Sequence, residues 1–320
     1  MRAVAQAQPN FALIKYWGKK DLERNLPAVG SLSITLESLW TRMTVEFVKD
    51  GVPDLLQVNG QDNQPLKPRV ARCLDLVAGK RRPPAIVHSE SNFPIAAGLA
   101  SSAAAFAALV VAAEGAGGGS RGALPLARLA GRASGSAARS LFGGCAELTP
   151  GDDDISVQQL APHNDWPLQV IVALTTEAAK PLGSGAGMIR SAETSPFYSS
   201  WVGQQEHDLT VARAAVLARD FDKLAAVSEY NCLKMHSVMW TSRPSIVYWN
   251  QATLSCMETV RDLQQDGHPV FFTIDAGPQL KAVCLPEASA QVATALAATP
   301  GVVRVMQSGL GPGARLLEAD

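Results

Sequence analysis

The chain of 320 residues is 47% hydrophobic and 18% charged, a composition typical of a folded protein large enough for two domains. Intrinsic disorder is excluded because it needs low hydrophobicity and a high net charge, and the formal net charge here is -1. The 28 Lys and Arg residues against 29 Asp and Glu residues lack the basic excess of a nucleic-acid-binding protein. A balanced total still allows a local basic pocket for a small anionic substrate.

The cysteines and the apolar segments predict where the protein works. Five cysteines, an odd number, are spread along the chain with no pair at the C-x-x-C spacing of a zinc site. That pattern is typical of free thiols in a reducing compartment. Residues 1–20 lack the apolar core of a signal peptide, and the Ala-rich stretch 103–113 is too short to span a bilayer. We therefore expect a cytoplasmic protein without membrane contact.

The first half of the chain mixes predicted strands and helices. Alternation of polar and apolar residues predicts strands, and apolar spacing of three or four residues with glycine stops predicts helices. In chain order they are strands 31–36, 41–48 and 55–60, helix 70–79, strand 84–94, helices 101–114 and 124–134, strand 143–154, which runs into an acidic turn, and the buried strand 168–176.

The second half begins with helices and ends with strands. In chain order the predicted elements are helical stretches within 195–238, helix 246–265, strands 270–275 and 280–285, helix 289–298, strand 302–307, and the closing loop and strand 309–318. Because strands and helices are grouped and do not strictly alternate, the pattern favours an α+β fold over a doubly wound parallel sheet. A Pro/Gly-rich turn at 176–183 predicts a soft domain boundary.

The segment 94–109, PIAAGLASSAAAFAAL, carries the clearest functional pattern. Gly98 permits close backbone approach, and Ser101 and Ser102 offer hydroxyls where a helix begins. The first N–H groups of a helix have no partner within it, and the helix dipole adds positive potential, so this turn suits a phosphate. It is neither a Walker A loop nor a Rossmann fingerprint, because both spacings are missing. By itself, an ordinary Ser-capped helix start explains these residues equally well.

Two more segments combine cations with hydroxyl or aromatic groups. Residues 10–20, NFALIKYWGKK, contain three lysines beside Tyr and Trp, and lysine is a compact charge suited to phosphate or carboxylate. Residues 134–144, SGSAARSLFGG, add two serines and Arg139, whose planar fork matches either anion. The alternatives are an edge strand with solvated lysines and a Ser/Gly turn with an exposed arginine.

Residues 272–278, FTIDAGP, place Asp275 at the end of an apolar strand, where functional groups often lie. The alternative is an aspartate that caps a turn. Residues 308–317, SGLGPGARLL, form a glycine-rich closing segment, which we expect to be structural.

Together these motifs resemble one branch of the GHMP kinase superfamily, the diphosphomevalonate decarboxylase family. Pro-x-x-x-Gly-Leu-x-Ser-Ser-Ala resembles the superfamily's phosphate loop, and Ser-Asn-Phe-Pro before it is similar to this branch. Asn-x-Ala-x-x-Lys-Tyr-Trp-Gly-Lys, Ser-Gly-Ser-Ala-x-Arg-Ser-x-x-Gly-Gly and Asp-Ala-Gly-Pro resemble its other signatures, in the expected order from Asn10 to Leu317. The family commonly has Asn after the last proline, where this chain has Gln279.

The resemblance implies the roles of individual residues. The implied catalytic residues are Asp275 as the base, Lys15 beside the reacting centre, and Arg139, which holds the departing carboxylate. The implied substrate-binding residues are Tyr16, Lys19, Ser134, Ser136 and Arg139. The implied ATP-binding residues are Asn92, Gly98, Leu99, Ala100, Ser101 and Ser102. Magnesium is expected on the ATP phosphates, with Ser101 or Ser102 as its candidate protein contact.

The resemblance also implies a fold and a reaction. The fold is the α+β GHMP-kinase fold, with a lobe at 1–178, a second lobe at 179–320, mixed or antiparallel sheets, and the active site in the cleft between them. The reaction is the ATP-dependent decarboxylation of mevalonate 5-diphosphate to isopentenyl diphosphate, ADP, phosphate and carbon dioxide, a step of isoprenoid biosynthesis. The implied assembly is a homodimer.

Two alternatives remain open from the sequence, besides a decarboxylase that acts on a monophosphate, against which the serines expected to bind the diphosphate speak. One is a GHMP kinase that phosphorylates mevalonate or a mevalonate phosphate without decarboxylation, and Arg139 with its neighbouring serines favours the decarboxylase over it. The other is a non-catalytic protein on the same scaffold, which would have no need to keep Lys15, Arg139 and Asp275 together. The roles of the acidic turn 152–154 and of His236, which we expect to be structural, are left open.

Overall fold

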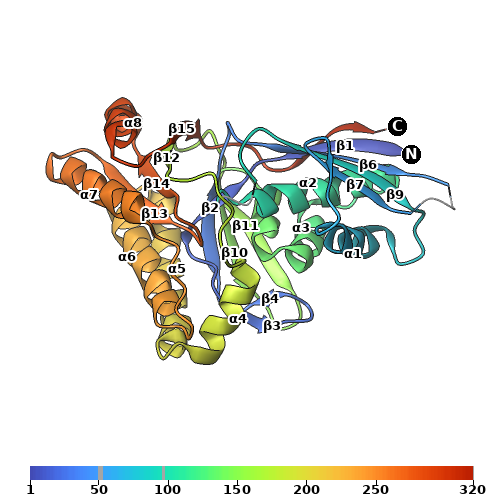
Figure 1. Ribbon diagram of the computed structural model, residues 1–320, viewed down its shortest axis with the longest axis horizontal. Coiled ribbons are helices and arrows are strands. Elements are labelled where there is room, and N and C mark those ends of the chain that lie inside the picture. The colour runs from blue at the N-terminus through green and yellow to red at the C-terminus, as the bar shows by residue number, and fades with distance from the viewer. Residues whose placement is uncertain (50–52, 96–97, 320) are drawn as a thin grey trace.

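Six strands form the sheet that carries both chain ends in the computed structural model, which describes residues 1–49, 53–95 and 98–319 (Figure 1). The strand order is β16-β1-β6-β9-β7-β8, and only the β7–β9 pair is parallel. The strands are β1 (Arg2–Ala7), β6 (Thr41–Phe47), β7 (Leu55–Val58), β8 (Gln61–Asp62), β9 (Ala85–Ser91) and β16 (Arg315–Ala319).

Helix α2 (Ser101–Ala116) is the central helix of this half of the molecule. It packs on β1 and β6, while α1 (Lys67–Ala78) and α3 (Ala123–Ala133) pack against it. Most of its residues after Ser102 are buried, which is the property of a helix that is apolar on every face. Because many of them are alanines, the sheet and the neighbouring helices approach closely. The start of α2 is thereby held firmly in place.

A second sheet occupies the middle of the molecule and has the antiparallel order β11-β10-β5-β2. Its strands are β2 (Asn10–Ile14), β5 (Ser31–Thr35), β10 (Cys145–Pro150) and β11 (Ile155–Ala161), with the short hairpin β3 (Lys19–Asp21) and β4 (Leu26–Pro27) beside them. The 3-10 helix η1 (Gly135–Leu141) packs on β2, β5 and β10. Two motif segments, 10–20 and 134–144, therefore meet at this sheet.

A third sheet, with the antiparallel order β13-β14-β12-β15, lies on the opposite side of the middle sheet from the six-stranded sheet (Figure 1). Helices α6 and α7 pack on β13, and α8 packs on β12 and β15. The strands are β12 (Gln169–Leu174), β13 (Val270–Ile274), β14 (Leu280–Cys284) and β15 (Arg304–Gly309). The helices are α4 (Ser184–Thr194), α5 (Tyr198–Ala218), α6 (Phe221–Trp240), α7 (Gln251–Gln265), η2 (Pro286–Ala288) and α8 (Ser289–Ala298).

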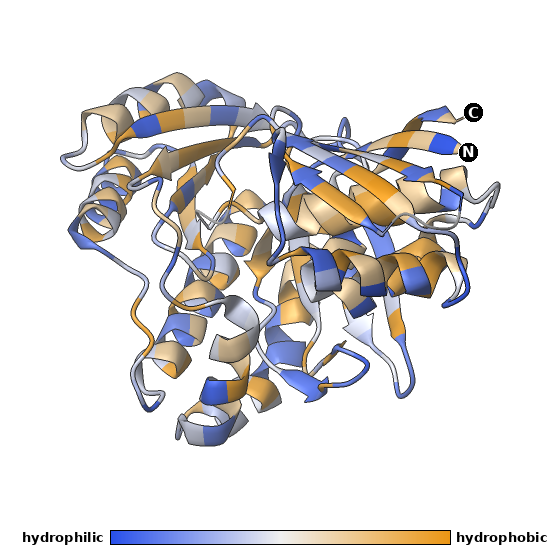
Figure 2. Ribbon diagram, turned by 45° about the vertical axis from the view of Figure 1, so that its right-hand side comes forward, coloured by the Kyte–Doolittle hydropathy of each residue, from blue (hydrophilic) through white to orange (hydrophobic). Residues whose placement is uncertain are grey.

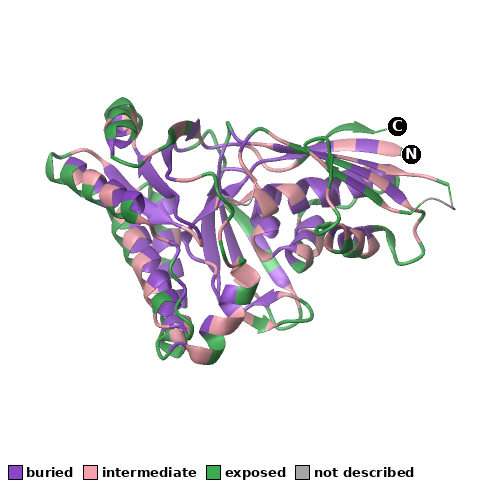
Figure 3. Cartoon of the chain, in the orientation of Figure 1, coloured by how far each residue is buried: buried purple, intermediate pink, exposed green. Residues whose placement is uncertain are grey.

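The hydrophobic core joins these layers. Hydrophobic segments are mixed with hydrophilic ones along the strands in Figure 2, and the inner strands are largely buried in Figure 3. One core cluster lies between the six-stranded sheet and α1 to α3, and another joins β2 and β5 to β12, β13, α5 and α6. The second cluster fixes the middle sheet against the C-terminal helices. Within the described part of the chain, no helix is long and apolar enough to cross a membrane.

The α+β prediction agrees with this architecture, but some predicted elements have different ends. The helix predicted at 246–265 begins at Gln251, because Asn250 and Thr253 form a capping box that starts it there. The strand predicted at 302–307 is β15 at Arg304–Gly309. Strands β1 and β11 and helix α4 are among the elements that were not predicted, and a strand at residues 10–20, where β2 lies, was only an alternative interpretation.

The sheet memberships bear on the division of the chain. Strand β12 pairs with β14 and β15, and β16 returns to pair with β1. The first lobe as predicted, residues 1–178, thus contains one strand of the C-terminal sheet, and the last strand of the chain belongs to the N-terminal sheet. The division at 178 stays a prediction.

Candidate active site

Asp275 follows β13 directly and forms ion pairs with two buried lysines. Lys15 Nζ lies 2.7 Å from Asp275 Oδ1, and Lys281 Nζ lies 3.5 Å from Oδ2. The two lysine side chains are 1% and 0% exposed, whereas that of Asp275 is 24% exposed. Two buried cations therefore hold the carboxylate on its protein side, and its exposed side is accessible to a ligand.

The charges around Asp275 decide its protonation. Burial by itself would raise the pKa of Asp275, but the charges of Lys15 and Lys281, the hydrogen bond from Lys15 and the charge of Arg139 lower it to about 2. Burial lowers the pKa of Lys281 to about 8, against the opposing effect of Asp275. Two lysines contact this carboxylate and the charge of Arg139 also acts on it, so the site has an excess of positive charge suited to anions.

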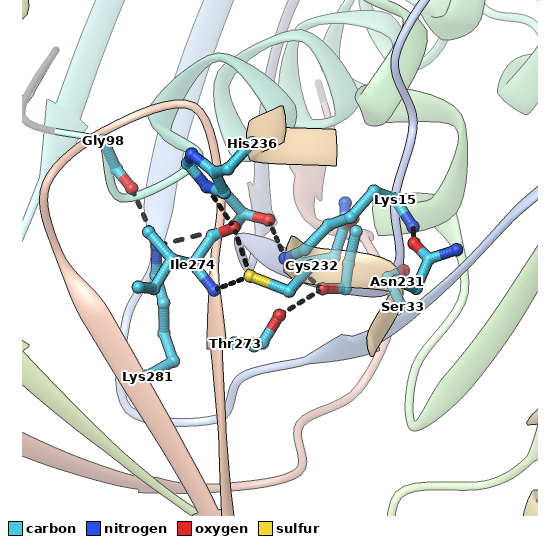
Figure 4. A network of polar contacts seen from close by, with 12 residues as sticks. Lys15, Ser33, Gly98, Asn231, Cys232, His236, Thr273, Ile274 and Lys281 are labelled. Atoms are coloured by element: carbon cyan, nitrogen blue, oxygen red, sulfur yellow. Dashed lines mark hydrogen bonds and ion pairs between the residues drawn. The ribbon is translucent and has the colours of Figure 1, made fainter. Parts of the chain in front are cut away.

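The main chain of Lys15, which follows β2, is held by side chains of two helices. Its N–H donates to Asn231 Oδ1 at 2.8 Å, and its carbonyl accepts from Gln205 Nε2 at 2.6 Å. Its ammonium also donates to the Ala12 carbonyl at 2.7 Å. Figure 4 shows Lys15 and Asn231 side by side in this network. The position of the Lys15 amine is thus fixed from both ends of the residue.

Arg139 lies in η1 and is 1% exposed. It donates from Nε to Ser33 Oγ at 2.9 Å, from Nη1 to Ser31 Oγ at 2.5 Å and from Nη2 to Asn10 Oδ1 at 3.2 Å. Burial lowers its pKa to about 10, with Asp275 opposing, so the guanidinium is charged at neutral pH. The hydroxyl and amide partners are neutral, and the positive charge is left for a ligand.

The substrate-binding candidates line the serine turn. Among the described residues, the buried Tyr16 hydroxyl has no hydrogen-bond partner, and burial raises its pKa to about 12, so it stays an O–H donor. A Cβ at Gly135, between the two serines of this turn, would lie 2.3 Å from Tyr16 Oη, so a larger residue there would displace the Tyr16 hydroxyl. Ser134 Oγ lies 3.5 Å from Ser102 Oγ, which links this turn to the phosphate loop.

Ser136 and Lys19 lie around the same turn. The Ser136 carbonyl accepts a hydrogen bond from Asn10 Nδ2 at 2.9 Å, so the residue that contacts Arg139 also holds the turn. Burial, together with the nearby charge of Arg69, lowers the pKa of Lys19. Lys19 and Arg69 thus form a second group of cations on this side of the site.

The phosphate loop lies directly beside the Asp-Ala-Gly-Pro motif. Gly98 has φ +84°, and a Cβ there would approach Gly277 Cα to 3.2 Å, so both conformation and contact favour glycine. The Gly98 carbonyl accepts from Lys281 Nζ at 3.2 Å (Figure 4). Ala100 has a left-handed conformation just before α2 begins at Ser101, and Leu99 is fully buried. Residues 96 and 97 of the motif lie outside the described residues.

The structure places the remaining candidates in supporting positions. The amide of Asn92 accepts from Trp40 N–H and donates to the Ser38 carbonyl, both at 2.8 Å, so it holds the connection between β5 and β6. Its assignment to ATP stays a prediction. In the acidic turn 152–154, Asp153 pairs with Arg24 and Asp154 with Arg132.

Lys281 and Arg69 lie at the candidate site, and neither was predicted from the sequence. Lys281 is the one charged residue of the strand LKAVC, and a lysine inside so short an apolar strand was an available signal. Arg69 follows a proline at the start of α1, stacks over the Phe106 ring at 4.3 Å and donates from Nη2 to the Ala133 carbonyl at 3.0 Å, next to Ser134. Arg69 is one of several arginines in its segment, and nothing local distinguishes it.

Comparison with known proteins gives the same family for both halves of the chain. Residues 7–159 match the model of the diphosphomevalonate decarboxylase-like N-terminal domain, and residues 170–307 match that of the mevalonate 5-diphosphate decarboxylase C-terminal domain. The diphosphomevalonate decarboxylase of Candida albicans is 31% identical over 97% of this chain and 96% of its own length. The human diphosphomevalonate decarboxylase is 33% identical over 91% of this chain and 78% of its own length.

Solved structures agree with the sequence relatives. The crystal structure of mevalonate diphosphate decarboxylase from Staphylococcus aureus has a TM-score of 0.92 at 33% identity, covering 99% of this chain and 98% of that one. A structure described as MDDEF in complex with MVAPP, AMPPCP and magnesium has a TM-score of 0.91 at 36% identity, covering 100% and 99%. The fold is therefore the GHMP-type fold of these enzymes, and the chain belongs to the diphosphomevalonate decarboxylase family.

Proposed function

We propose that this chain catalyses the ATP-dependent decarboxylation of mevalonate 5-diphosphate to isopentenyl diphosphate, ADP, phosphate and carbon dioxide. The observation that carries the proposal is the meeting of Lys15, Arg139 and Asp275, from three distant segments, beside the phosphate loop. Family membership supports the same reaction, since the relatives are named diphosphomevalonate decarboxylases.

The first step is phosphoryl transfer to the tertiary hydroxyl of the substrate. Asp275 accepts a hydrogen bond from this hydroxyl and orients its oxygen toward the γ-phosphoryl group of ATP. With a pKa of about 2, Asp275 is a weak base, so it takes the proton only as the new P–O bond forms. Lys15 and Lys281 neutralise the charge that develops on the transferring group. ADP leaves with the electron pair of the broken bond.

The second step is loss of phosphate and carbon dioxide. The C–O bond to the new phosphate breaks with its electron pair, which leaves positive charge on the tertiary carbon. The bond between the neighbouring carbon and the carboxylate then breaks, and its electrons form the alkene. Arg139 holds that carboxylate and, because its pKa is about 10, does not give it a proton at neutral pH. A protonated carboxyl group would release the electrons of this carbon–carbon bond less readily than a carboxylate does.

The phosphates of both substrates have candidate donors. Tyr16, Lys19, Arg69 and Ser134 surround the turn where we place the substrate diphosphate. Ser101 and Ser102 stand at the start of α2, where backbone N–H groups and the helix dipole favour ATP phosphates. Their hydroxyls are oxygen ligands of the kind that would hold magnesium, and the ion would supply charge that neutralises the phosphates.

We further propose a cytoplasmic homodimer, and sedimentation of the purified protein tests the assembly.

The decisive experiment incubates the purified protein with ATP, magnesium and mevalonate 5-diphosphate. ADP and carbon dioxide should form in equal amounts and only when all three are present. A parallel reaction with mevalonate 5-phosphate tests whether the diphosphate is required, and we expect it to be turned over far more slowly. Formation of ADP without carbon dioxide would refute the proposal in favour of a small-molecule kinase.

A further inference from the structure

One helix, α6, touches the backbone beside both members of the Lys15–Asp275 ion pair. On the Lys15 side, Asn231 Oδ1 accepts a hydrogen bond from the Lys15 N–H. The amide of Asn231 also donates from Nδ2 to Gln205 Oε1 at 2.8 Å and to Asp208 Oδ2 at 2.6 Å. Because both of these partners are acceptors, the Nδ2 group must face them and Oδ1 must face Lys15.

On the Asp275 side, α6 covers the open edge of β13. Strand β13 is the edge strand of its sheet, so alternate N–H and C=O groups point away from β14. Phe272 N–H donates to Glu229 Oε1 at 3.0 Å, and Ile274 N–H donates to Cys232 Sγ at 3.2 Å. Side chains of α6 therefore occupy the place that a further strand would take.

The carbonyl of Ile274 is held by the same face of α6. It lies 3.2 Å from His236 Nε2 and 3.4 Å from Cys232 Sγ. Positions 229, 232 and 236 are three, four and seven residues apart, a spacing that places them on one side of a helix. Figure 4 shows Cys232 and His236 converging on Ile274, and Ile274 is bonded covalently to Asp275.

His236 is fully buried, and burial lowers its pKa to about 3, so the ring is neutral. The same Nε2 atom also lies 3.2 Å from Trp249 Nε1. A neutral imidazole nitrogen either donates or accepts, so it serves the Ile274 carbonyl or the Trp249 indole N–H, one at a time. A glutamine amide at this position has both a donor and an acceptor and can serve both partners.

We propose that Asn231, Cys232 and His236 of α6 are positioning residues, which set the distance between the Lys15 amine and the Asp275 carboxylate in the reaction proposed above. They hold the backbone of Lys15 and of Ile274 on one rigid helix, so the two reacting groups share a common support. A displacement of roughly 1 Å at a reacting group can reduce the rate of an enzyme about a hundredfold.

The test compares variants that keep or remove these hydrogen bonds. In His236→Phe and Cys232→Ala, kcat for carbon dioxide release should fall about tenfold to a hundredfold, while KM for mevalonate 5-diphosphate changes little. His236→Gln and Cys232→Ser retain hydrogen-bonding groups at these positions and should recover most of kcat. This division between kcat and KM follows because the substrate-binding side chains are untouched.

A matched control separates positioning from general stability. Leu224 is a fully buried residue of α6 that packs in the core cluster of α5 and β2. Leu224→Ala should lower Tm, because it leaves a cavity, yet keep kcat. The proposal is overturned if His236→Phe and Cys232→Ala keep wild-type kcat. It is also overturned if kcat falls as far in His236→Gln and Cys232→Ser as it does in His236→Phe and Cys232→Ala. If His236→Phe does not fold, the comparison of kcat between Cys232→Ala and Cys232→Ser decides the question.

The two proposals fail differently. A wild-type protein that releases no carbon dioxide from mevalonate 5-diphosphate contradicts the proposed function. An active wild type with unaffected α6 variants contradicts the positioning role alone.

Discussion

The reacting centre and the phosphate-binding rim of this site differ in how fully their side chains are bonded within the protein. We define the reacting centre as Lys15, Arg139, Asp275 and Lys281, and the rim as Tyr16, Lys19, Ser102 and Ser134. In the centre the three cations are at most 1% exposed, and each has at least two hydrogen-bond or ion-pair partners. In the rim the Tyr16 hydroxyl has no partner among the described residues, and the two serines meet only at 3.5 Å.

This difference shows how one site divides chemistry from binding. Groups that stabilise a transition state work best when they are already in place, because no reorganisation is then needed during the reaction. Groups that hold a diphosphate need free donors, and a buried hydroxyl without a partner gains a strong hydrogen bond when the ligand arrives. Changes in the centre should therefore lower kcat, and changes in the rim should raise KM.

Asp275→Asn should have the largest effect in the centre. The change keeps the shape of the side chain but removes the charge that orients the hydroxyl and receives its proton. We expect kcat to fall about 10²- to 10⁴-fold with KM for the substrate nearly unchanged, as measured by ADP release. Asp153→Asn, in the exposed acidic turn, is the matched control. Wild-type kcat in Asp275→Asn would end the assignment.

The pH dependence of kcat/KM tests the charge of Lys281 in the reacting centre. Because burial lowers the pKa of Lys281 to about 8, it loses its proton as the pH rises through that value, and kcat/KM should decline there. In Lys281→Met this alkaline decline should vanish, and kcat/KM at pH 7 should be roughly tenfold to a hundredfold lower. The pH profile of kcat/KM is the measurement.

The control for this experiment is Lys223→Met, which removes an exposed lysine. It should keep both the activity at neutral pH and the decline near pH 8. If Lys281→Met shows the same decline as the wild type, another group titrates there and the role given to Lys281 is wrong.

Tyr16→Phe should have the smallest effect and tests the rim. Loss of one donor to a phosphate should raise KM for mevalonate 5-diphosphate about tenfold while kcat is kept. Because the hydroxyl is buried without a partner in the free protein, its removal should leave Tm unchanged or slightly raised. Steady-state kinetics and thermal unfolding check both parts, with the exposed Tyr230→Phe as control. A fall in kcat at unchanged KM would place Tyr16 in the centre instead.

Much of the site was predictable because each motif is local. Asp275 stands out at the end of an apolar strand, and Arg139 stands out between serines and glycines. Lys281 and the hydrogen-bond partners of Arg139 have no comparably strong local pattern. Ser31, Ser33 and Asn10 lie on two strands whose pairing places them around the guanidinium, and no local pattern connects them to residue 139.

The fold was predictable to a similar depth. Alternating strands such as β5 and the Ala-rich helix α2 have strong local patterns, and the structure contains both. Membership of sheets had no such pattern. The sequence predicted a domain boundary just after strand β12. The strands that pair with β12 are nevertheless β14 and β15, more than 100 positions further along the chain.

The amino-acid sequence by itself determined which residue types are available for the chemistry, where the phosphate loop begins α2, and the α+β class of the fold. These features depend on the backbone preferences and spacing of neighbouring residues. Only the tertiary structure decided that Lys15 contacts Asp275 across 260 positions, that Lys281 completes the pair, and that α6 covers the edge of β13. Such contacts form when distant apolar surfaces are buried together, and local spacing does not specify which surfaces meet.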